Sequence, residues 1–439
     1  MDADVIVIGA GAAGLGAARK LAGRSIRVVL LEARERVAGR VWSRRIASMP
    51  TFAELGAEFV HGRAEQTMAL IREVGMETAA ADGERWIRKN GDLRIANNDF
   101  TSAAAIFKGA AALSRDESVD RFLRRFDGNG TMRETVEMAR TFVEGFDAAD
   151  PAIASARAIA QEWGSGVDTT SARPIGTYQP IFQHLQRVCD AMGVAMCLST
   201  VVRRISWHRD GVEVSATNDR GESRTIESRA AIITLPVGVL RHGGDETVVE
   251  FDPDLPLDKR KALGSIEMGH VVKVALWFRA PFWERVRNGR YYNAAFFRGK
   301  GQPFATYWTQ LPERSRLIVA WVGGPKARAL GGVAETHLIE QAVNGFGSLL
   351  GAPEGARQEF EAGAVHDWDR DPFARGAYSY VAVGGADARV TLAAPVDDTL
   401  FFAGEATSND GQGGTVNGAL ETGERAAAQV ANAFGVRRD

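Results

Sequence analysis

The stretch Val5-Ile6-Val7-Ile8-Gly9-Ala10-Gly11-Ala12-Ala13-Gly14 joins a short apolar run to a glycine-rich turn. The run has the length and β-branched content of a buried parallel strand. A helix of small residues is expected from Ala12 to about Leu21, and a second strand, 26–31, ends in Glu32. The alternative interpretation is a glycine turn that binds no ligand, and such a turn would need neither the second strand nor Glu32. The order therefore predicts a dinucleotide-binding βαβ unit.

Each position of the G-x-G-x-x-G has a physical role. Gly9 makes the tight turn, Gly11 lets the backbone approach a pyrophosphate, and Gly14 lets the helix pack close to the strand. The phosphates then meet the amide-rich helix start, which includes Ala13. Glu32 is expected to reach the ribose hydroxyls.

Three arginines follow the acid, in Arg34-Glu35-Arg36-Val37-Ala38-Gly39-Arg40. Arg34 and Arg40 are predicted to hold a diphosphate permanently through fork-shaped, charge-assisted hydrogen bonds. An enzyme that releases its dinucleotide after each turnover has little use for so many clamps. The alternative is a solvated arginine-rich turn.

Composition excludes several classes of function. The 439 residues suffice for two or more domains, and the formal net charge of −2 argues against a nucleic-acid partner. Seven scattered histidines and two cysteines, Cys189 and Cys197, predict no metal site and fit a reducing compartment. No leader peptide and no apolar run of membrane-spanning length stand out. We therefore expect a cytoplasmic protein without a membrane partner.

Several separated motifs resemble those of the flavin-containing amine oxidases, which include monoamine and polyamine oxidases, L-amino-acid oxidases and lysine-specific histone demethylases. Residues 36–40 are similar to the family's R-x-G-G-R, with Ala38 where glycine is usual. Residues 54–62 resemble its E-L-G-A-x-x-x-H-G, and residues 402–407 its F-A-G-E-x-T. Residues 414–419 resemble its helix start, G-T-V-x-G-A. The resemblance covers both ends and the middle of the chain.

The resemblance implies an α/β fold in which a Rossmann-like FAD-binding domain is interleaved with an α+β substrate-binding domain. Segments 1–78, 195–267 and 387–439 are assigned to the FAD-binding domain. Segments 79–194 and 268–386 are assigned to the substrate-binding domain, the first of them expected to be helical. Residues 201–207 and 212–214 are expected to form a hairpin.

The resemblance also implies the cofactor contacts. Gly39 joins Arg40 at the diphosphate, Gly56 and Ala57 pass beside the flavin ring, and Val202 meets adenine through its backbone. Trp368 packs near the flavin, and Glu405, after Gly404, accepts hydrogen bonds from the ribityl chain. The amides of Thr415 and Val416 face the pyrimidine end of the ring. FAD is expected to be non-covalent, because both cysteines are remote from residues 376–378.

The residues expected to perform chemistry are Lys273 and Tyr378. The resemblance places Lys273 near flavin N5, where its charge would stabilise developing superoxide; the alternative is a lysine pointing to solvent from a half-exposed strand. Tyr378 and Thr415 match the pair that flanks the substrate amine, and threonine leaves this cage half-open. Glu58 and His61 suit a cationic amine. The alternative for His61 is a histidine satisfied by neighbouring backbone.

The predicted function is FAD-dependent oxidation of a primary amine or polyamine. Hydride transfer to flavin N5 gives an imine, then an aldehyde, and O2 becomes hydrogen peroxide. The partners are the small amine and O2, in a monomer or homodimer. The alternatives are a flavin dehydrogenase or desaturase that uses another electron acceptor, and a flavin-holding interaction module.

Overall fold

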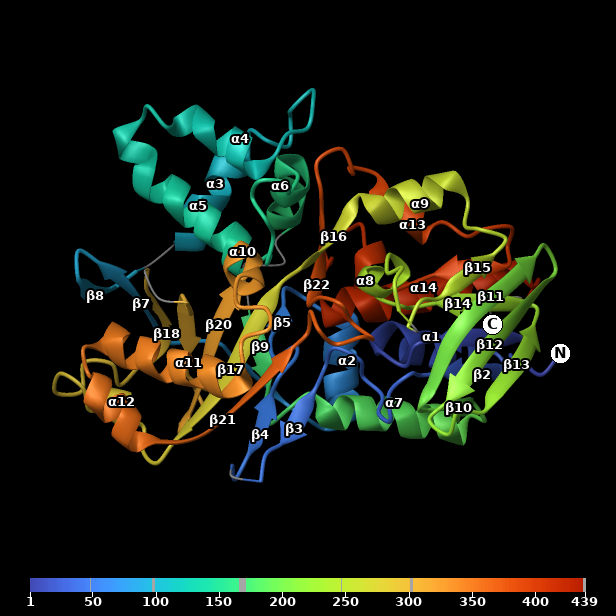
Figure 1. Ribbon diagram of the computed structural model, residues 1–439, viewed down its shortest axis with the longest axis horizontal. Coiled ribbons are helices and arrows are strands. Elements are labelled where there is room, and N and C mark those ends of the chain that lie inside the picture. Colours follow the sequence, from blue (N-terminus) through green and yellow to red (C-terminus); the bar gives the residue numbers. More distant parts are fainter. Residues whose placement is uncertain (48, 97–98, 166–170, 246, 301–302, 437–439) are drawn as a thin grey trace.

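The computed structural model describes all residues except 48, 97–98, 166–170, 246, 301–302 and 437–439. The chain folds into two lobes that it enters more than once (Figure 1). One lobe holds a parallel sheet with the amino-terminal helix, and the other holds a large, mostly antiparallel sheet. A cluster of helices between residues 99 and 164 stands above the second sheet (Figure 1).

The parallel sheet has the order β10-β2-β1-β14-β23. Its strands are β10 (Ala195–Cys197), β2 (Val28–Leu31), β1 (Val5–Ile8), β14 (Ala230–Ile233) and β23 (Leu400–Phe402). All neighbours are parallel, and β1 is buried at every position. Val5 and Val7 face one hydrophobic cluster while Ile6 and Ile8 face another, so both faces of the sheet are covered. The predicted βαβ unit is present.

Small residues let helices approach closely on one face of this sheet. Helix α1 (Ala12–Ala22) packs against α14 (Val416–Ala433). A Cβ on Gly423 would lie 2.1 Å from the carbonyl oxygen of Ala13, so a larger residue there would force the helices apart. Helix α7 (Gln179–Ala191) also packs on α1 and shares its hydrophobic cluster. The predicted boundary at residue 194 separates α7 from the helix on which it packs, and the domain bounds stay a prediction.

The second lobe is built on a seven-stranded sheet of order β21-β17-β20-β19-β18-β7-β8. Its strands are β21 (Phe360–Asp367), β17 (Val271–Phe278), β20 (Leu317–Gly323), β19 (Thr306–Trp308), β18 (Ala294–Arg298), β7 (Glu84–Lys89) and β8 (Asp92–Ile95). Strand β17 is buried at all eight positions. Helices α11 (Glu335–Leu350) and α12 (Pro353–Glu359) lie beside this sheet (Figure 1).

The segment 79–194 was expected to be helical, and this is only partly right. Helices α3 (Asp99–Phe107), α4 (Val119–Leu123), α5 (Arg133–Gly145) and α6 (Ala156–Gly164) form the cluster above the sheet. However, β7 and β8 extend the large sheet, and β9 (Ser171–Pro174) pairs with β5 (Val60–His61) and β6 (Thr78–Ala80). These strands are too short, and too irregular in polarity, for periodicity to reveal them.

The predicted hairpin is confirmed as β11 (Thr200–His208) and β12 (Gly211–Asn218). It belongs to a four-stranded sheet with β13 (Ser223–Ser228) and β15 (Glu250–Asp252). The remaining elements are β3 (Ser43–Arg45), β4 (Phe52–Glu54), α2 (Glu65–Glu73), α8 (Val237–Leu240), α9 (Leu257–Gly264), β16 (Ile266–Gly269), α10 (Gly324–Arg328), β22 (Tyr378–Val381) and α13 (Ala388–Ala393), with short 3-10 turns at Arg124–Phe126, Gly130–Met132, Phe282–Glu284 and Glu405–Thr407.

Candidate active site

One cavity of about 460 Å³ runs from the glycine-rich turn of the first lobe into the second lobe. Its wall includes every site residue predicted from the sequence except Gly14. Gly14 has the packing role expected for it, because a Cβ there would lie 1.8 Å from the carbonyl oxygen of Gly9. The predicted residues therefore converge although they are spread from position 9 to position 416.

The first end of the cavity has the features of a phosphate site. Gly9 has φ +104°, a conformation that favours glycine. Gly11 precedes α1 and provides no side-chain cap, and a Cβ on it would meet no atom within 4 Å. Open space therefore lies in front of the uncapped helix N-terminus, where an anion is stabilised by free amides and the helix dipole. The residues present fit a pyrophosphate.

Glu32 closes this end of the cavity. Its carboxylate accepts hydrogen bonds from the backbone amides of Ala10, at 2.7 Å, and Arg34, at 2.9 Å. Burial raises the pKa of this carboxyl, although the two hydrogen bonds oppose the shift. Val202 lines the same end, at a bulge in β11. Glu32 thus holds the turn in shape, and its predicted contact with ribose stays a prediction.

The two predicted diphosphate clamps bind carboxylates in this structure. The Nη1 and Nη2 atoms of Arg34 donate to the two oxygens of Asp371, at 2.9 and 2.6 Å. Arg40 donates through Nη1 to Glu405, at 2.8 Å, and to the carbonyl of Ala377, at 2.9 Å. Both arginines still line the cavity, and both tie the first lobe to segments near residues 371–405.

Gly56 lines the cavity, and the protein's own backbone leaves no room for a side chain at this position. A Cβ at this position would lie 1.9 Å from the carbonyl oxygen of Arg40. The amides of Leu55 and Ala57 donate to the carbonyls of Trp42 and Arg40, so two backbone segments cross here. Backbone crowding by the protein itself already requires glycine at this position, and the approach of a flavin ring stays a prediction.

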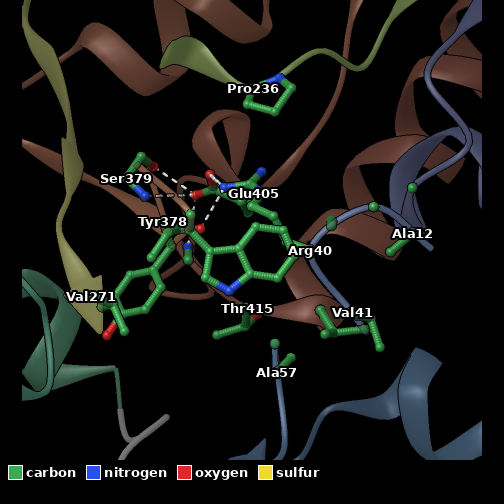
Figure 2. A pocket seen from close by; sticks show the side chains of 18 of the residues that line it. Ala12, Arg40, Val41, Ala57, Pro236, Val271, Tyr378, Ser379, Glu405 and Thr415 are labelled. Carbon is green, nitrogen blue, oxygen red and sulfur yellow. Dashed lines mark hydrogen bonds and ion pairs between the residues drawn. The ribbon is translucent and has the colours of Figure 1, made fainter. Parts of the chain in front are cut away.

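Buried polar contacts organise the centre of the cavity (Figure 2). Glu405 accepts hydrogen bonds from the hydroxyl of Ser379, at 2.6 Å, and from the amide of Gly414, at 3.1 Å. Burial favours the neutral acid, but the charges of Arg40 and Arg389 outweigh it and lower the pKa of Glu405. Arg40 donates to the same carboxylate, so protein donors already occupy both of its oxygens. Glu405 therefore holds the surrounding segments of the cavity wall in place. Its predicted contact with a ribityl chain stays a prediction.

Helix α14 points its N-terminus at this region. Thr415 is the N-cap, and its hydroxyl accepts from the amide of Gly418 at 2.9 Å and donates to the carbonyl of Gln412 at 2.8 Å. Its hydroxyl is therefore committed to the cap. Thr415 and Val416 line the cavity at the positive end of the helix dipole, which would stabilise negative charge on a bound group.

Lys273 lies in the middle of the buried strand β17 and is 2% exposed. Its ammonium is 2.8 Å from Oε2 of Glu58 and donates to the carbonyl of Gly56 at 3.0 Å. The predicted alternative, a lysine pointing to solvent, is wrong. Glu58, which was expected to meet a cationic amine, is instead in contact with the lysine.

Aromatic side chains form the chamber beyond Lys273. Tyr378 donates its hydroxyl to the carbonyl of Phe146, at 2.5 Å. The His61 ring packs edge-on to Phe146, with centroids 5.4 Å apart, and its Nδ1 lies 3.1 Å from the hydroxyl of Ser171. Burial lowers the pKa of His61 to about 4, so it is neutral near pH 7. An uncharged imidazole does not repel a substrate cation.

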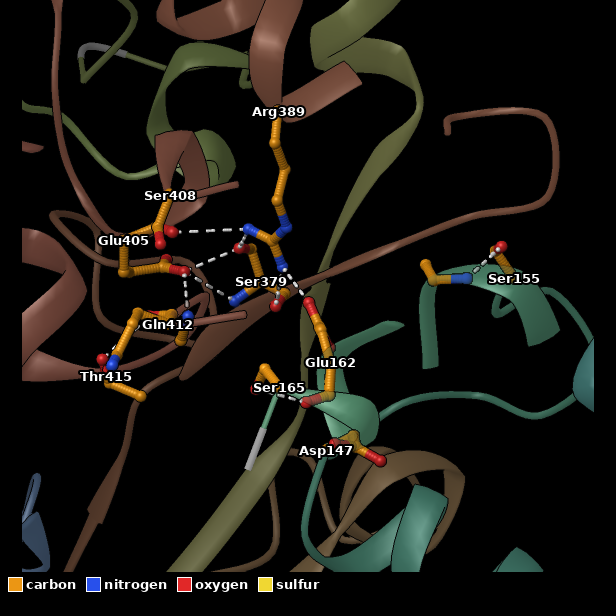
Figure 3. Close-up of polar contacts among 12 residues, drawn as sticks. Asp147, Ser155, Glu162, Ser165, Ser379, Arg389, Glu405, Ser408, Gln412 and Thr415 are labelled. Atoms are coloured by element: carbon orange, nitrogen blue, oxygen red, sulfur yellow. Dashed lines mark hydrogen bonds and ion pairs between the residues drawn. The ribbon is translucent and has the colours of Figure 1, made fainter. Parts of the chain in front are cut away.

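Two acids on the chamber wall were missed at the sequence level. Glu162 of α6 accepts from Nη2 of Arg389 at 3.0 Å, and its side chain is 21% exposed (Figure 3). Asp147 accepts from Nε1 of Trp163 at 3.1 Å. Burial raises the pKa of Glu162, and Arg389 opposes the shift. Each acid stands alone in a helical segment without a motif, so only its position on the cavity wall reveals it.

Comparison with known proteins gives this arrangement a family. Residues 12–431 match the family model described as flavin containing amine oxidoreductase. The chain belongs to that family. The match leaves out only the first eleven and the last eight residues of the chain.

The relatives differ in the substrates that their names give. The chain is 27% identical to polyamine oxidase 4 of Oryza sativa subsp. japonica, covering 96% of this chain and 87% of the relative. It is also 27% identical to human lysine-specific histone demethylase 2, covering 97% of this chain but only 53% of that protein. A putrescine oxidase structure superposes with a TM-score of 0.81 at 21% identity, covering 98% and 99% of the two chains. A cyclohexylamine oxidase from Brevibacterium oxydans IH-35A gives 0.80 at 20% identity, covering 99% and 100%.

Two absences concern the described part of the chain. Within it, no helix is both long and apolar enough to cross a lipid bilayer. The same residues contain no group of three or more His, Cys, Asp or Glu side chains that could hold a metal ion.

Proposed function

We propose that the protein is an oxidase that binds FAD non-covalently and oxidises a primary amine or polyamine. The observation that carries the proposal is the continuity of the cavity, which joins the uncapped N-terminus of α1 to an aromatic chamber with Lys273 on its wall. A dinucleotide with a flavin at its far end has this extended shape. A bound flavin would supply the acceptor for a hydride from the carbon beside the substrate nitrogen and would return its two electrons and one proton to O2, while the second proton of the hydrogen peroxide would come from the substrate nitrogen through solvent.

The protein's own residues supply orientation and a dry environment. Tyr378, held by the Phe146 carbonyl, and the neutral His61 ring form walls against which the amine is aligned. An apolar chamber disfavours the ammonium form, so the nitrogen lone pair becomes available when the substrate loses its proton. The positive end of α14 stabilises the charge that the reduced flavin carries.

We infer that diamines and polyamines are better substrates than monoamines, because Glu162 offers a carboxylate to a second ammonium group. Polyamine oxidase relatives support this choice. The histone demethylases support it less, because this chain spans only about half of their length.

The test is the visible spectrum of the purified protein, followed by anaerobic bleaching with putrescine, spermidine, aromatic monoamines and L-amino acids. We expect a flavin spectrum that is bleached by amines and restored by air with release of peroxide. A protein that stays colourless after incubation with FAD, or that responds only to L-amino acids, contradicts the proposal.

The second candidate is a flavin dehydrogenase of the same fold. The contacts of Lys273 with Glu58 and with the Gly56 carbonyl favour it, because a lysine that two protein oxygens already hold can be structural and needs no role toward oxygen. Comparing turnover with O2 and with an artificial electron acceptor separates the two. An oxidase turns over with O2 alone at a rate similar to its rate with the artificial acceptor, whereas a dehydrogenase turns over only when the acceptor is present.

A further inference from the structure

We propose that Glu58 is a positioning residue for Lys273, and that this pair, rather than the lysine alone, sets the rate at which the reduced flavin reacts with oxygen. The inference rests on the proposed function. It also replaces the expected role of Glu58, which was recognition of the substrate's ammonium group.

Both oxygens of Glu58 are engaged by the protein. Oε2 lies 2.8 Å from the Lys273 ammonium. Oε1 accepts from Nε1 of Trp308 at 2.9 Å, and Nη2 of Arg173 lies 3.5 Å away. The side chain is only 5% exposed, so an incoming ammonium would have to displace a buried cation. Glu162, with 21% of its side chain exposed at the cavity, is the more accessible carboxylate.

The carboxylate is also the counter-ion of two buried cations. Lys273 is 2% exposed and Arg173 is 9% exposed, and Glu58 is within ion-pair distance of both. Burial alone would raise the pKa of Glu58, but the charges of Lys273 and Arg173 outweigh it and hold that pKa below its usual range. Removing the negative charge would therefore leave two cations facing each other across a dry site.

Other titratable groups also surround the lysine. Glu54 lies on β4, and burial raises its pKa to about 7. His366 stands opposite Lys273 on β21 and is itself 2.9 Å from Asp371. Any pH effect that belongs to the Glu58 pair must therefore be measured above the range in which Glu54 titrates.

The position of the ammonium depends on the pair. Lys273 is fixed by Glu58 on one side and by the Gly56 carbonyl on the other, and Gly56 belongs to the segment that lines the cavity. Without its counter-ion, a buried ammonium gives up its proton more readily. Oxygen would then meet a neutral amine, and the electrostatic assistance would be lost as pH rises.

The experiment compares wild type with Glu58→Gln, Glu58→Asp and Lys273→Met. The flavin of each is photoreduced without substrate, mixed with aerated buffer, and followed by its absorbance between about pH 8 and pH 10. We expect little pH dependence in wild type and in Glu58→Asp, which keeps the charge. In Glu58→Gln the reoxidation rate should fall roughly tenfold across this range, whereas Lys273→Met should be slow at every pH.

A second measurement distinguishes positioning from substrate binding. Under the proposal, the amine concentration that half-saturates anaerobic bleaching changes less than about twofold in Glu58→Gln. A rise of about tenfold with unchanged reoxidation would overturn the proposal, because Glu58 would then bind the ammonium. Photoreduction needs no amine, so the oxygen measurement stands even if the proposed substrates fail.

The apoprotein provides a readout that does not involve activity. Glu58→Gln should lower the melting temperature because it leaves Lys273 unpaired, and adding Lys273→Met should recover part of the loss. If the decreases in melting temperature caused by Glu58→Gln and Lys273→Met were strictly additive in the double variant, the two residues would not be coupled. This result would also overturn the proposal.

Discussion

Glu162 shows what a single side chain can decide in this cavity. Its carboxylate reaches the chamber wall while Arg389 holds one oxygen. Replacing it with glutamine keeps the shape and removes the charge. We expect Glu162→Gln to raise the KM for diamines about tenfold, with less than about a twofold change for a monoamine of equal length, because only the diamine has a second cation.

Steady-state peroxide assays on matched substrates measure this difference. The control is Glu144→Gln, which makes the same charge change on α5, where Glu144 pairs with Lys326. Equal increases for diamine and monoamine would show that Glu162 does not select the second amino group.

His61 makes a prediction about acid stability. The pKa of His61 is lowered to about 4 in the folded protein, against about 6.5 when the chain is unfolded. As pH falls below about 6.5, His61 becomes protonated in the unfolded chain but stays neutral in the folded protein. The free energy of unfolding therefore decreases until pH reaches about 4. The loss attributable to this residue is on the order of 3 kcal/mol.

Chemical denaturation at pH 7 and at pH 4.5 tests this account. His61→Gln should lose less free energy of unfolding between the two values than wild type. Replacing the exposed His337 in the same way should leave the wild-type dependence unchanged. If both variants behave alike, another group is responsible for the acid sensitivity.

At the scale of elements, the turn between β1 and α1 separates binding from folding. A Cβ on Gly11 meets no atom within 4 Å, whereas one on Gly14 would lie 1.8 Å from a backbone oxygen. Gly11→Ala should therefore leave the melting temperature of the apoprotein unchanged. It should weaken FAD binding about tenfold or more, because the methyl group would occupy the space expected for the pyrophosphate.

Gly14→Ala should instead lower the yield of folded protein or its melting temperature. Titration of each apoprotein with FAD, followed by flavin fluorescence, and thermal melts distinguish the two effects. Unweakened binding in Gly11→Ala would place the phosphates elsewhere.

The same scale shows what sequence can reveal. Strand, glycine turn and helix were predictable because their spacing and chemistry are local, and the motifs near residues 54, 273, 405 and 415 pointed to one site. The Lys273–Glu58 pair was not predictable, because it joins a loop and a strand more than 200 positions apart. Gly56 was recognised as necessary, but its cause, the crossing with Arg40, depends on tertiary structure.

For the whole molecule, the bidentate ion pair between Arg34 and Asp371 joins the two lobes. Arg34 is 14% exposed and Asp371 is 3% exposed, so the pair is largely dry. Removing one partner leaves the other charge buried, which costs about 3 kcal/mol. We expect Arg34→Met to lower stability by this order and to split the calorimetric transition, because the lobes lose a shared contact.

Asp371→Asn added to Arg34→Met should recover part of the loss, because no buried charge then remains unpaired. The comparison is made on apoprotein, since a cofactor that spans both lobes would itself couple them. A single sharp transition with an unchanged midpoint in Arg34→Met would show that the Arg34–Asp371 ion pair contributes nothing to cooperative unfolding of the two lobes.

The strand order β10-β2-β1-β14-β23 has a consequence for biosynthesis. Strand β1 is synthesised before its neighbour β14, which follows some two hundred residues later, and β23 and α14 follow later still. The parallel sheet can therefore close only after β23 has been synthesised, and pairing of such distant segments is slow. We expect the coenzyme to be loaded only once β23 and α14 are in place, so that the supply of flavin at that stage should govern how much newly made polypeptide becomes holoprotein.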